Sequence, residues 1–334
     1  MSRLRRRVAF HSLIWVVICL VALAVVAIGA TAWGLRADQI AAGYRETDRT
    51  ASMLADQTTR SITTLDAGLK DMRAHIAGLG IDTPDDFSRR AGTSEMFRYL
   101  TQRLALLPQA TAITLTGSDG RVVNTTRQWP RPDANFSDRD FFKYLSRVDD
   151  NQIYVNLPVK SRLGGTLTVY FSRRVNARNG AFAGVVAIAV EIEYFANIYE
   201  SVSAVSGQQF LLLRRDGTTI WRYPEPVHRL GEKLPADSAF FAAVRNGGGS
   251  YRSLGRLHRG VRLVSVRPLR DYPLVVNVAL LENSVLASWN RRMLAIGAGT
   301  LLVVCCAGVL LRIWAKQLGR LIASEAQLAR KSQE

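Results

Sequence analysis

Two long apolar stretches bracket this chain of 334 residues and constrain its fold more than any other feature. The first covers residues 13–34, and the second lies within residues 291–314. Each is long enough for a helix to cross the hydrocarbon core of a bilayer, which takes about 20 apolar residues. We therefore expect two transmembrane helices at these positions, with a large domain between them.

Basic residues beside the apolar stretches indicate the orientation of the chain. Residues 1–12 carry an arginine cluster that begins at Arg3, and residues 315–334 carry several more basic side chains, starting at Lys316. Short basic flanks usually stay on the cytoplasmic side of a membrane. We expect both termini to lie in the cytoplasm and the large domain to lie in the periplasm or outside the cell. Residues 315–334 are expected to form the start of a signalling helix.

A cleaved signal peptide is the alternative interpretation of the first stretch, because Ala30, Thr31 and Ala32 have the form of a cleavage site. Its apolar region is longer than the roughly 7–15 residues typical of a signal peptide, which favours an uncleaved anchor. The three cysteines all lie in the apolar stretches, at positions 19, 305 and 306. The large domain therefore folds without disulfides.

The net charge of +17 does not indicate a nucleic-acid partner. Much of the excess comes from the membrane flanks, and the arginines of the large domain form no basic stripe interleaved with aromatic residues. Catalysis is disfavoured as well, because the four histidines lack metal-ligand spacing and neither a G-x-S-x-G motif nor a phosphate loop occurs. We expect no catalytic site, no cofactor and no metal in this chain.

Residues 35–80 have the pattern of one long helix. Apolar residues recur at alternating spacings of three and four residues, which places them in one stripe on the helix; they include Ile62, Leu65, Leu69, Met72 and Ile76. Two interpretations of this stripe have equal weight. It packs against the helix's own domain, or it also pairs with a second subunit in a homodimer.

The rest of the large domain repeats one pattern, in residues 81–203 and again in residues 204–290. Each half opens with a strand, a turn and a second strand; the turns contain Asp119-Gly120 and Asp216-Gly217. Each half closes with a long hairpin. This self-similarity predicts two tandem α+β modules, each an antiparallel sheet of about five strands with helices on one face.

Four short segments follow one another in the first half: DRDFF at 138–142, FSRR at 171–174, GVV at 184–186 and EYF at 193–195. With the long helix and the repeat, this order resembles the double-Cache family of bacterial extracytoplasmic sensor domains over roughly residues 35–285. The resemblance implies two tandem PAS-like modules between two transmembrane helices of a bacterial cytoplasmic-membrane receptor. Residues 81–203 would be the membrane-distal ligand module, and residues 204–290 the membrane-proximal module that couples binding to the second transmembrane helix.

The resemblance also points to Arg127 and Trp129 as ligand contacts. An arginine can bind a carboxylate with two hydrogen bonds, and a tryptophan ring can cover a cation or an apolar group. Family members that bind amino acids have an Arg-x-Trp-Tyr run here and an Asp that holds the ligand's amine. This chain has Pro130 and Ala189 at those two places, which favours a carboxylate or another small polar ligand over an α-amino acid.

Five further residues are candidates for the same site. Tyr154 and Tyr170 would reach the ligand face from adjacent strands. Asp138, Asp140 and Arg173 are candidates too, although ties between the loop and the sheet explain them better. The structural alternative for Arg127 is a surface ion pair, and for Trp129 it is a place in the core.

The expected partners are a small-molecule ligand, the membrane, a second copy of the chain, and a cytoplasmic output that this sequence does not contain. The resemblance is greatest to domains that precede diguanylate cyclase, phosphodiesterase or histidine kinase outputs. The competing hypothesis is a membrane-anchored scaffold whose outer domain binds a protein partner instead of a small molecule.

Overall fold

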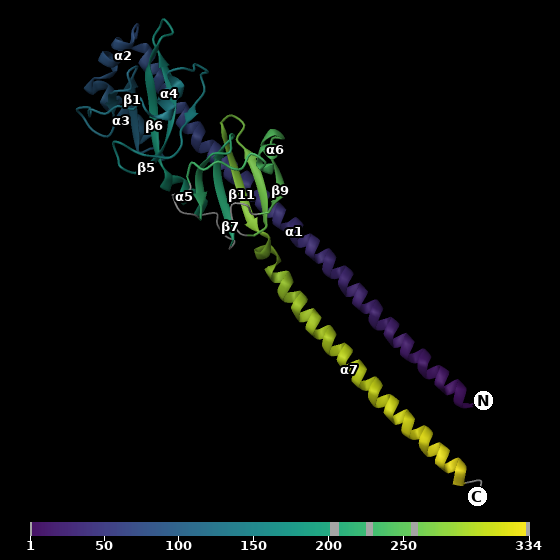
Figure 1. Ribbon diagram of the computed structural model, residues 1–334. Coiled ribbons are helices and arrows are strands. Elements are labelled where there is room, and N and C mark those ends of the chain that lie inside the picture. The colour runs from purple at the N-terminus through teal and green to yellow at the C-terminus, as the bar shows by residue number, and fades with distance from the viewer. Residues whose placement is uncertain (1, 201–206, 225–229, 255–259, 332–334) are drawn as a thin grey trace. The chain divides into compact units, whose positions relative to one another are not determined.

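The computed structural model describes residues 2–200, 207–224, 230–254 and 260–331. It separates into two compact units: the helix unit, residues 1–42 and 282–334, and the sheet unit, residues 43–281. Figure 1 shows both units and labels many of their helices and strands. Helix α1 (Ser2–Gly78) contributes to both units, and helix α7 (Glu282–Lys331) belongs to the helix unit.

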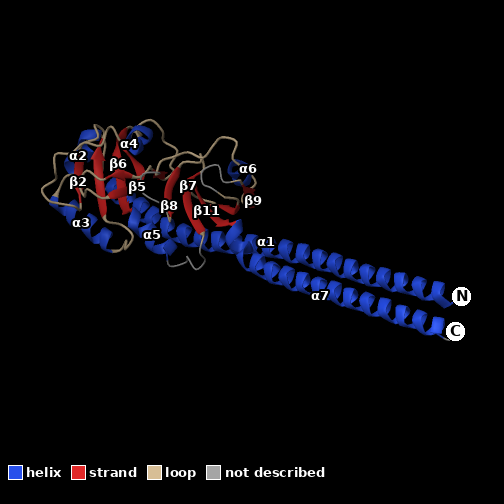
Figure 2. Ribbon diagram, turned by 60° about the horizontal axis from the view of Figure 1, so that its bottom comes forward, coloured by secondary structure: helices blue, strands red, loops and turns tan. Residues whose placement is uncertain are grey.

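Two helical segments are long and apolar enough to cross a membrane, Ile18–Gly78 within α1 and Glu282–Trp314 within α7. Within the helix unit the two helices lie side by side (Figures 1 and 2). The indole Nε1 of Trp289 donates to the carbonyl oxygen of Ala32 at 3.1 Å, and Arg36 pairs with Glu282 at 3.2 Å. The first apolar stretch and the stalk are one uninterrupted helix, because no proline divides them.

The part of α1 in the sheet unit, residues 43–78, buries the apolar stripe that the sequence predicts. Its members have at most 1% of their surface exposed and belong to the main hydrophobic core; they include Leu54, Ile62, Leu65, Leu69 and Ile76. The stripe therefore packs against the helix's own domain, as one of the two interpretations held. Pairing with a second subunit stays a prediction.

The first module follows α1 and contains a six-stranded antiparallel sheet with the order β2-β1-β6-β5-β3, in which β4 also pairs with β5. Its helices are α2 (Pro84–Ala91), α3 (Ser94–Ala105), α4 (Asp140–Leu145) and α5 (Ile192–Glu200). Its strands are β1 (Ala112–Gly117), β2 (Val122–Thr125), β3 (Tyr154–Val155), β4 (Val159–Lys160), β5 (Leu167–Asn176) and β6 (Phe182–Glu191).

The second module contains a five-stranded antiparallel sheet with the order β8-β7-β11-β10-β9. Its elements are β7 (Gln208–Arg214), β8 (Thr219–Tyr223), α6 (Ala239–Arg245), β9 (Gly249–Ser253), β10 (Arg262–Pro268) and β11 (Leu274–Leu281). The strand order repeats that of the first module, and both opening hairpins have a register shift, at Leu115/Thr116 and at Leu212/Leu213. The predicted α+β fold of two tandem modules is confirmed, and Figure 2 shows the strands of both beside α1.

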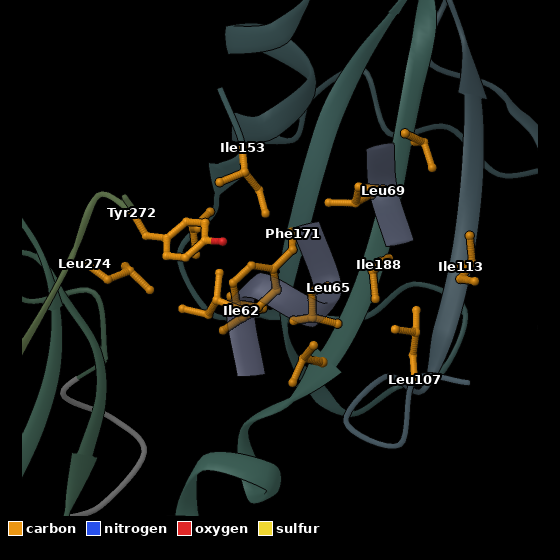
Figure 3. Packing of buried hydrophobic residues seen from close by; sticks show 14 of the residues in the cluster. Ile62, Leu65, Leu69, Leu107, Ile113, Ile153, Phe171, Ile188, Tyr272 and Leu274 are labelled. Carbon is orange, nitrogen blue, oxygen red and sulfur yellow. The ribbon is translucent and has the colours of Figure 1, made fainter. Parts of the chain in front are cut away.

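One hydrophobic core spans the two modules. Figure 3 shows Ile62, Leu65 and Leu69 of α1 packed beside Phe171 and Ile188, which face α1 from the first sheet. The same cluster contains Tyr272 and Leu274 from the second module. A change in the packing of one sheet therefore reaches the other through a continuous, densely packed interior.

Between α1 and the first strand the chain forms two helices, α2 and α3; Thr93 caps α3 by accepting a hydrogen bond from the backbone N–H of Met96 at 3.2 Å. The structure differs from the sequence expectation in one detail. Helices were expected on one face of each sheet, but α4 and α6 cover the second face as well. Both faces need cover because the central strands bury almost every side chain.

The stripe supplies a test of the fold. Replacing Leu65 with Ala removes a buried side chain from the joint core and should destabilise the sheet unit by about 2–5 kcal/mol. Met53 lies on the same helix with 47% of its surface exposed, so Met53→Ala should change stability by less than about 0.5 kcal/mol. Thermal unfolding of the full chain in detergent measures both; equal melting temperatures for the two variants would contradict the packing.

Candidate functional site

The face of the first sheet that points away from α1, here called the outer face, contains the position where the resemblance places a ligand. Strand pairing sets its side chains in rows. In one row Thr114 lies opposite Thr125 and Ala187, and Ala187 lies opposite Ser172. The next row joins Ala112, Ala189 and Tyr170. The centre of the outer face therefore carries small residues bordered by hydroxyl groups.

Two hydroxyl groups of the outer face are buried and have no hydrogen-bond partner among the described residues. The Oγ of Ser172 and the Oγ1 of Thr116 hydrogen-bond to no residue that the structure describes, although both side chains are almost completely buried. A buried polar group that lacks a hydrogen bond is costly, so each such group needs an explanation, such as strain, a functional role or a bound water or ion. Both hydroxyls lie on the outer face, as register shows.

Arg127 lies at one edge of the outer face. Its Nη2 is 3.5 Å from Oε1 of Glu191, a long ion pair in which both side chains remain partly exposed. Thr166 donates to the same carboxylate oxygen at 2.9 Å. Gly164 leaves room for the guanidinium, because a Cβ atom at that position would lie 2.9 Å from Nη2 of Arg127. Arg127 is thus held loosely, with hydrogen-bond donors left for another acceptor.

Trp129 follows on the same loop but makes a different contact. Its ring centroid lies 5.8 Å from that of Phe97 in α3, and 39% of its surface is exposed. The structure therefore brings Trp129 to α3 and gives it no contact with Arg127 among the described ring and polar contacts.

The two tyrosines share a sheet face but have different neighbours. Tyr170 packs against Phe136 and Phe141 at centroid distances of 6.2 and 5.5 Å, and its hydroxyl donates to Ser161 Oγ at 3.1 Å. Tyr154 packs against Tyr144 in a tilted arrangement with ring centroids 4.8 Å apart, and it lines a cavity of about 310 Å³ between the two modules. Tyr170 therefore belongs to the outer face near Arg127, and Tyr154 borders a separate opening.

Asp138 and Asp140 lie in the loop region that covers the outer face. The Arg162 guanidinium donates two hydrogen bonds to Asp138, at 2.7 and 2.6 Å, and these lower the pKa of the Asp138 carboxyl below its ordinary value. Asp140 is exposed in the first turn of α4, where a negative charge is favourable. Asp138 therefore fixes the covering loop through its hydrogen bonds with Arg162, and Asp140 stabilises the start of α4, which covers the same face.

Arg173 points to the opposite face, toward α1. Its guanidinium contacts Asp66 of α1 at 2.6 Å, and both side chains are at least 93% buried. Lys70 adds a second contact to Asp66 at 2.9 Å. Arg173 thus ties the sheet to the long helix and lies apart from the outer-face residues, since the neighbouring Ser172 points the other way.

Some residues around Arg127 escaped the sequence reasoning, among them Ser161, Gly164 and Thr166. The turn they form has only a weak signal in the sequence, a Gly-Gly pair followed by a strand. Within the residues that the structure describes, no group of three or more His, Cys, Asp and Glu side chains could hold a metal ion.

Comparison with solved structures identifies the architecture. The chain matches the extracellular domain of rpHK1S-Z16, a protein assigned as a histidine kinase, with 26% identity and a TM-score of 0.62, over 75% of this chain and 98% of that one. The sheet unit has the fold of a Cache sensor domain. No protein-family model and no curated protein matches the sequence.

Two chemoreceptor domains share the Cache fold. The periplasmic sensory domain of Campylobacter jejuni Tlp1 matches with 12% identity and a TM-score of 0.58, over 72% of this chain and 95% of that one. The ligand-binding domain of Pseudomonas fluorescens CtaA, solved with L-alanine, matches with 14% identity and a TM-score of 0.53, over 72% and 98%. The extracellular domain of rpHK1S-Z16, together with the two apolar helices, indicates a membrane protein with an extracytoplasmic Cache domain.

The ion pair between Arg173 and Asp66 can be used to test whether Arg173 stabilises the fold and is not a ligand contact. Replacing Asp66 with Asn leaves the Arg173 charge buried without its partner charge, which should cost about 3–5 kcal/mol of stability. The matched control is Asp82→Asn, which breaks an exposed pair with Arg178 and should cost less than about 1 kcal/mol. Chemical denaturation of the full chain in detergent measures both, and an Asp66→Asn variant as stable as the control would show that the pair is not a structural tie.

Proposed function

We propose that this chain is a transmembrane receptor whose Cache domain binds a small polar or anionic ligand on the outer face of the first sheet. The observation that carries the proposal is the fold of the sheet unit, which it shares with sensor domains over about three quarters of the chain. The unpartnered hydroxyls of Ser172 and Thr116 support the same face as the binding surface.

The residues around the outer face favour a carboxylate ligand. Arg127 has a long contact to Glu191, so a ligand carboxylate can compete for its donors with better geometry. The small side chains of Ala187 and Ala189 offer no acceptor for a ligand amine. Ser172 and Thr116 would donate to or accept from the ligand's remaining polar atoms, and Tyr170 would flank it.

The proposed signal leaves through α7. Strand β11 ends at Leu281 and α7 begins at Glu282, so no linker separates the sheet from the second apolar helix. A ligand that binds one conformation of the Cache domain better than another shifts the population toward it by that difference in affinity. In the proposed receptor, two copies pair in a bacterial cytoplasmic membrane with cytoplasmic termini, and α7 carries the change to a diguanylate cyclase, histidine kinase or similar output.

Binding to the full chain in lipid nanodiscs tests the proposed site. A screen of small carboxylates and neutral polar metabolites should yield a compound that raises the melting temperature of the wild type. Arg127→Gln should weaken that compound's binding roughly tenfold or more, because a charge-assisted hydrogen bond is lost. Arg121→Gln is the matched control: Arg121 is an exposed arginine near the opposite end of β2 and should leave affinity unchanged.

Equal affinity of the wild type and of Arg127→Gln for that compound would show that it does not bind at Arg127 and would contradict the outer face as the ligand site. A chain that binds none of the compounds but captures a protein partner stably would favour the scaffold hypothesis instead.

Cysteine crosslinking tests the proposed route. In a chain with the native cysteines replaced by Ser, single cysteines placed along residues 293–311 should crosslink between copies, with a pattern that changes when ligand is added. Inserting two glycines between Leu281 and Glu282 should abolish the change while leaving ligand affinity intact, because the strand then no longer leads directly into the helix. An identical pattern with and without ligand in the uninterrupted chain would refute the route.

A further inference from the structure

The cavity of about 310 Å³ between the two modules, here called the junction cavity, has walls from both of them. The first module lines it with Tyr144 of α4 and with the chain that leads into β3, up to Tyr154 and the next residue. The second module lines it with the end of β7 and the turn between β10 and β11. Ile153 and Tyr272, one from each module, belong both to this wall and to the hydrophobic core (Figure 3). A molecule in the cavity would therefore contact both modules beside the core that joins them.

The fold of the second module gathers three arginines at this cavity. Arg214 is the last residue of β7, which pairs with β11. The backbone N–H of Arg215 donates to the carbonyl oxygen of Pro273 at 3.1 Å. Its guanidinium donates to the carbonyl oxygens of Leu269 and Arg270 at 2.8 and 3.3 Å. These bonds hold the turn before β11 beside the end of β7, so that Arg214, Arg215 and Arg270 all line the cavity.

The contacts of these arginines within the protein leave them able to bind another acceptor. Arg214 has a charged partner, Asp216, but the nitrogen and oxygen are 3.9 Å apart, which is too far for a hydrogen bond. Arg215 uses Nη2 for the two carbonyl oxygens, and Arg270 is exposed. An arginine has five N–H donors. A ligand can therefore accept hydrogen bonds from these side chains while the bonds that hold the turn stay in place.

The acidic residues of the lining limit the charge of the ligand. Asp150 and Asp271 both line the cavity. The oxygens of Asp150 accept hydrogen bonds from the hydroxyl of Tyr144 at 2.8 Å and from the backbone N–H of Gln152 at 3.0 Å, and Asp271 is exposed. Three arginines and two aspartates leave the lining with one excess positive charge. This balance favours a monoanion over a cation or a dianion.

The flat groups of the wall favour a ring on that anion. The ring of Tyr154 has the Tyr144 ring at a centroid distance of 4.8 Å and the guanidinium carbon of Arg214 at 5.6 Å. Tyr144 keeps 38% of its surface exposed, so its ring can pack against a second aromatic ring. Since Tyr144 and Arg214 both contact Tyr154, one small molecule can pack its ring on the tyrosine and direct a carboxylate to the arginine.

We propose that the junction cavity is a second ligand site and binds a small aromatic monocarboxylate. The ring packs on Tyr144 of the first module, and Arg214 and Arg270 of the second module bind the carboxylate. The cavity volume lies at the lower end of the range of about 300–1,000 Å³ for ligand sites, which suits a compound with one or two rings. Because the ligand contacts both modules, it stabilises their arrangement around the cavity. The site is separate from the outer face and does not depend on the proposed function.

Calorimetry with the full chain in nanodiscs tests this proposal, with benzoate and indole-3-carboxylate as probes and empty nanodiscs as the control for partition into lipid. At least one of the two probes should bind. Cyclohexanecarboxylate has the charge without the flat ring and should bind at least about threefold more weakly than benzoate. Benzamide has the ring without the charge and should bind at least about tenfold more weakly. Absence of binding by both aromatic carboxylates at about 1 mM would overturn the proposal.

Variants assign the binding to the junction cavity. Arg214→Gln should weaken binding of the aromatic carboxylate about tenfold or more, and Arg270→Gln, at an exposed position, should weaken it in the same direction. Tyr144→Leu should remove the preference for benzoate over cyclohexanecarboxylate. Melting temperatures show whether each variant folds. Arg245→Gln is the matched control, because Arg245 is an exposed arginine of α6 outside the lining and should leave affinity unchanged.

Arg127→Gln separates this site from the outer face. If Arg127→Gln abolishes binding of the aromatic carboxylate while Arg214→Gln and Arg270→Gln do not affect it, the junction site is wrong and the proposed function stands. If Arg214→Gln and Arg270→Gln weaken binding and Arg127→Gln does not, the junction site is supported, whatever the outer face binds.

Discussion

Burial of one helical stripe holds the sheet unit together. The residues of α1 from Ala51 to Ile76 pack against both sheets, and the sheets meet in the same core through Tyr272 and Leu274. Tyr199 of α5 reinforces the junction, because its buried hydroxyl lies 3.1 Å from that of Thr58 on α1 and its ring packs on Trp221 of the second module at 4.6 Å. Neither module can therefore repack without affecting the helix that both share.

This core determines which polar residues are available to a ligand. Each sheet has one face committed to α1 and one outer face, and along a strand neighbouring residues alternate between them. Arg173 and Ser172 are adjacent in sequence, yet Arg173 pairs with Asp66 on the helix while Ser172 faces the loop region. The residue type alone does not distinguish a structural tie from a ligand contact. The position along the strand does, because alternate residues point to opposite faces of the sheet.

The sequence was sufficient for the features that rest on length and periodicity. Two apolar stretches, the spacing of Ile62, Leu65 and Leu69, and two Asp-Gly turns predict the helices and the repeated sheets. It was not sufficient for the direction of Arg173, because β5 is buried on both faces and its apolar pattern does not alternate.

The first sheet is connected to the start of α7 through the shared core. Phe171 and Ile188 of the first sheet lie in the same hydrophobic cluster as Leu274 and Val278 of β11, the strand that ends at Leu281, one residue before α7 begins. In the proposed receptor, a ligand on the outer face would therefore act on α7 by changing how β11 packs in this core.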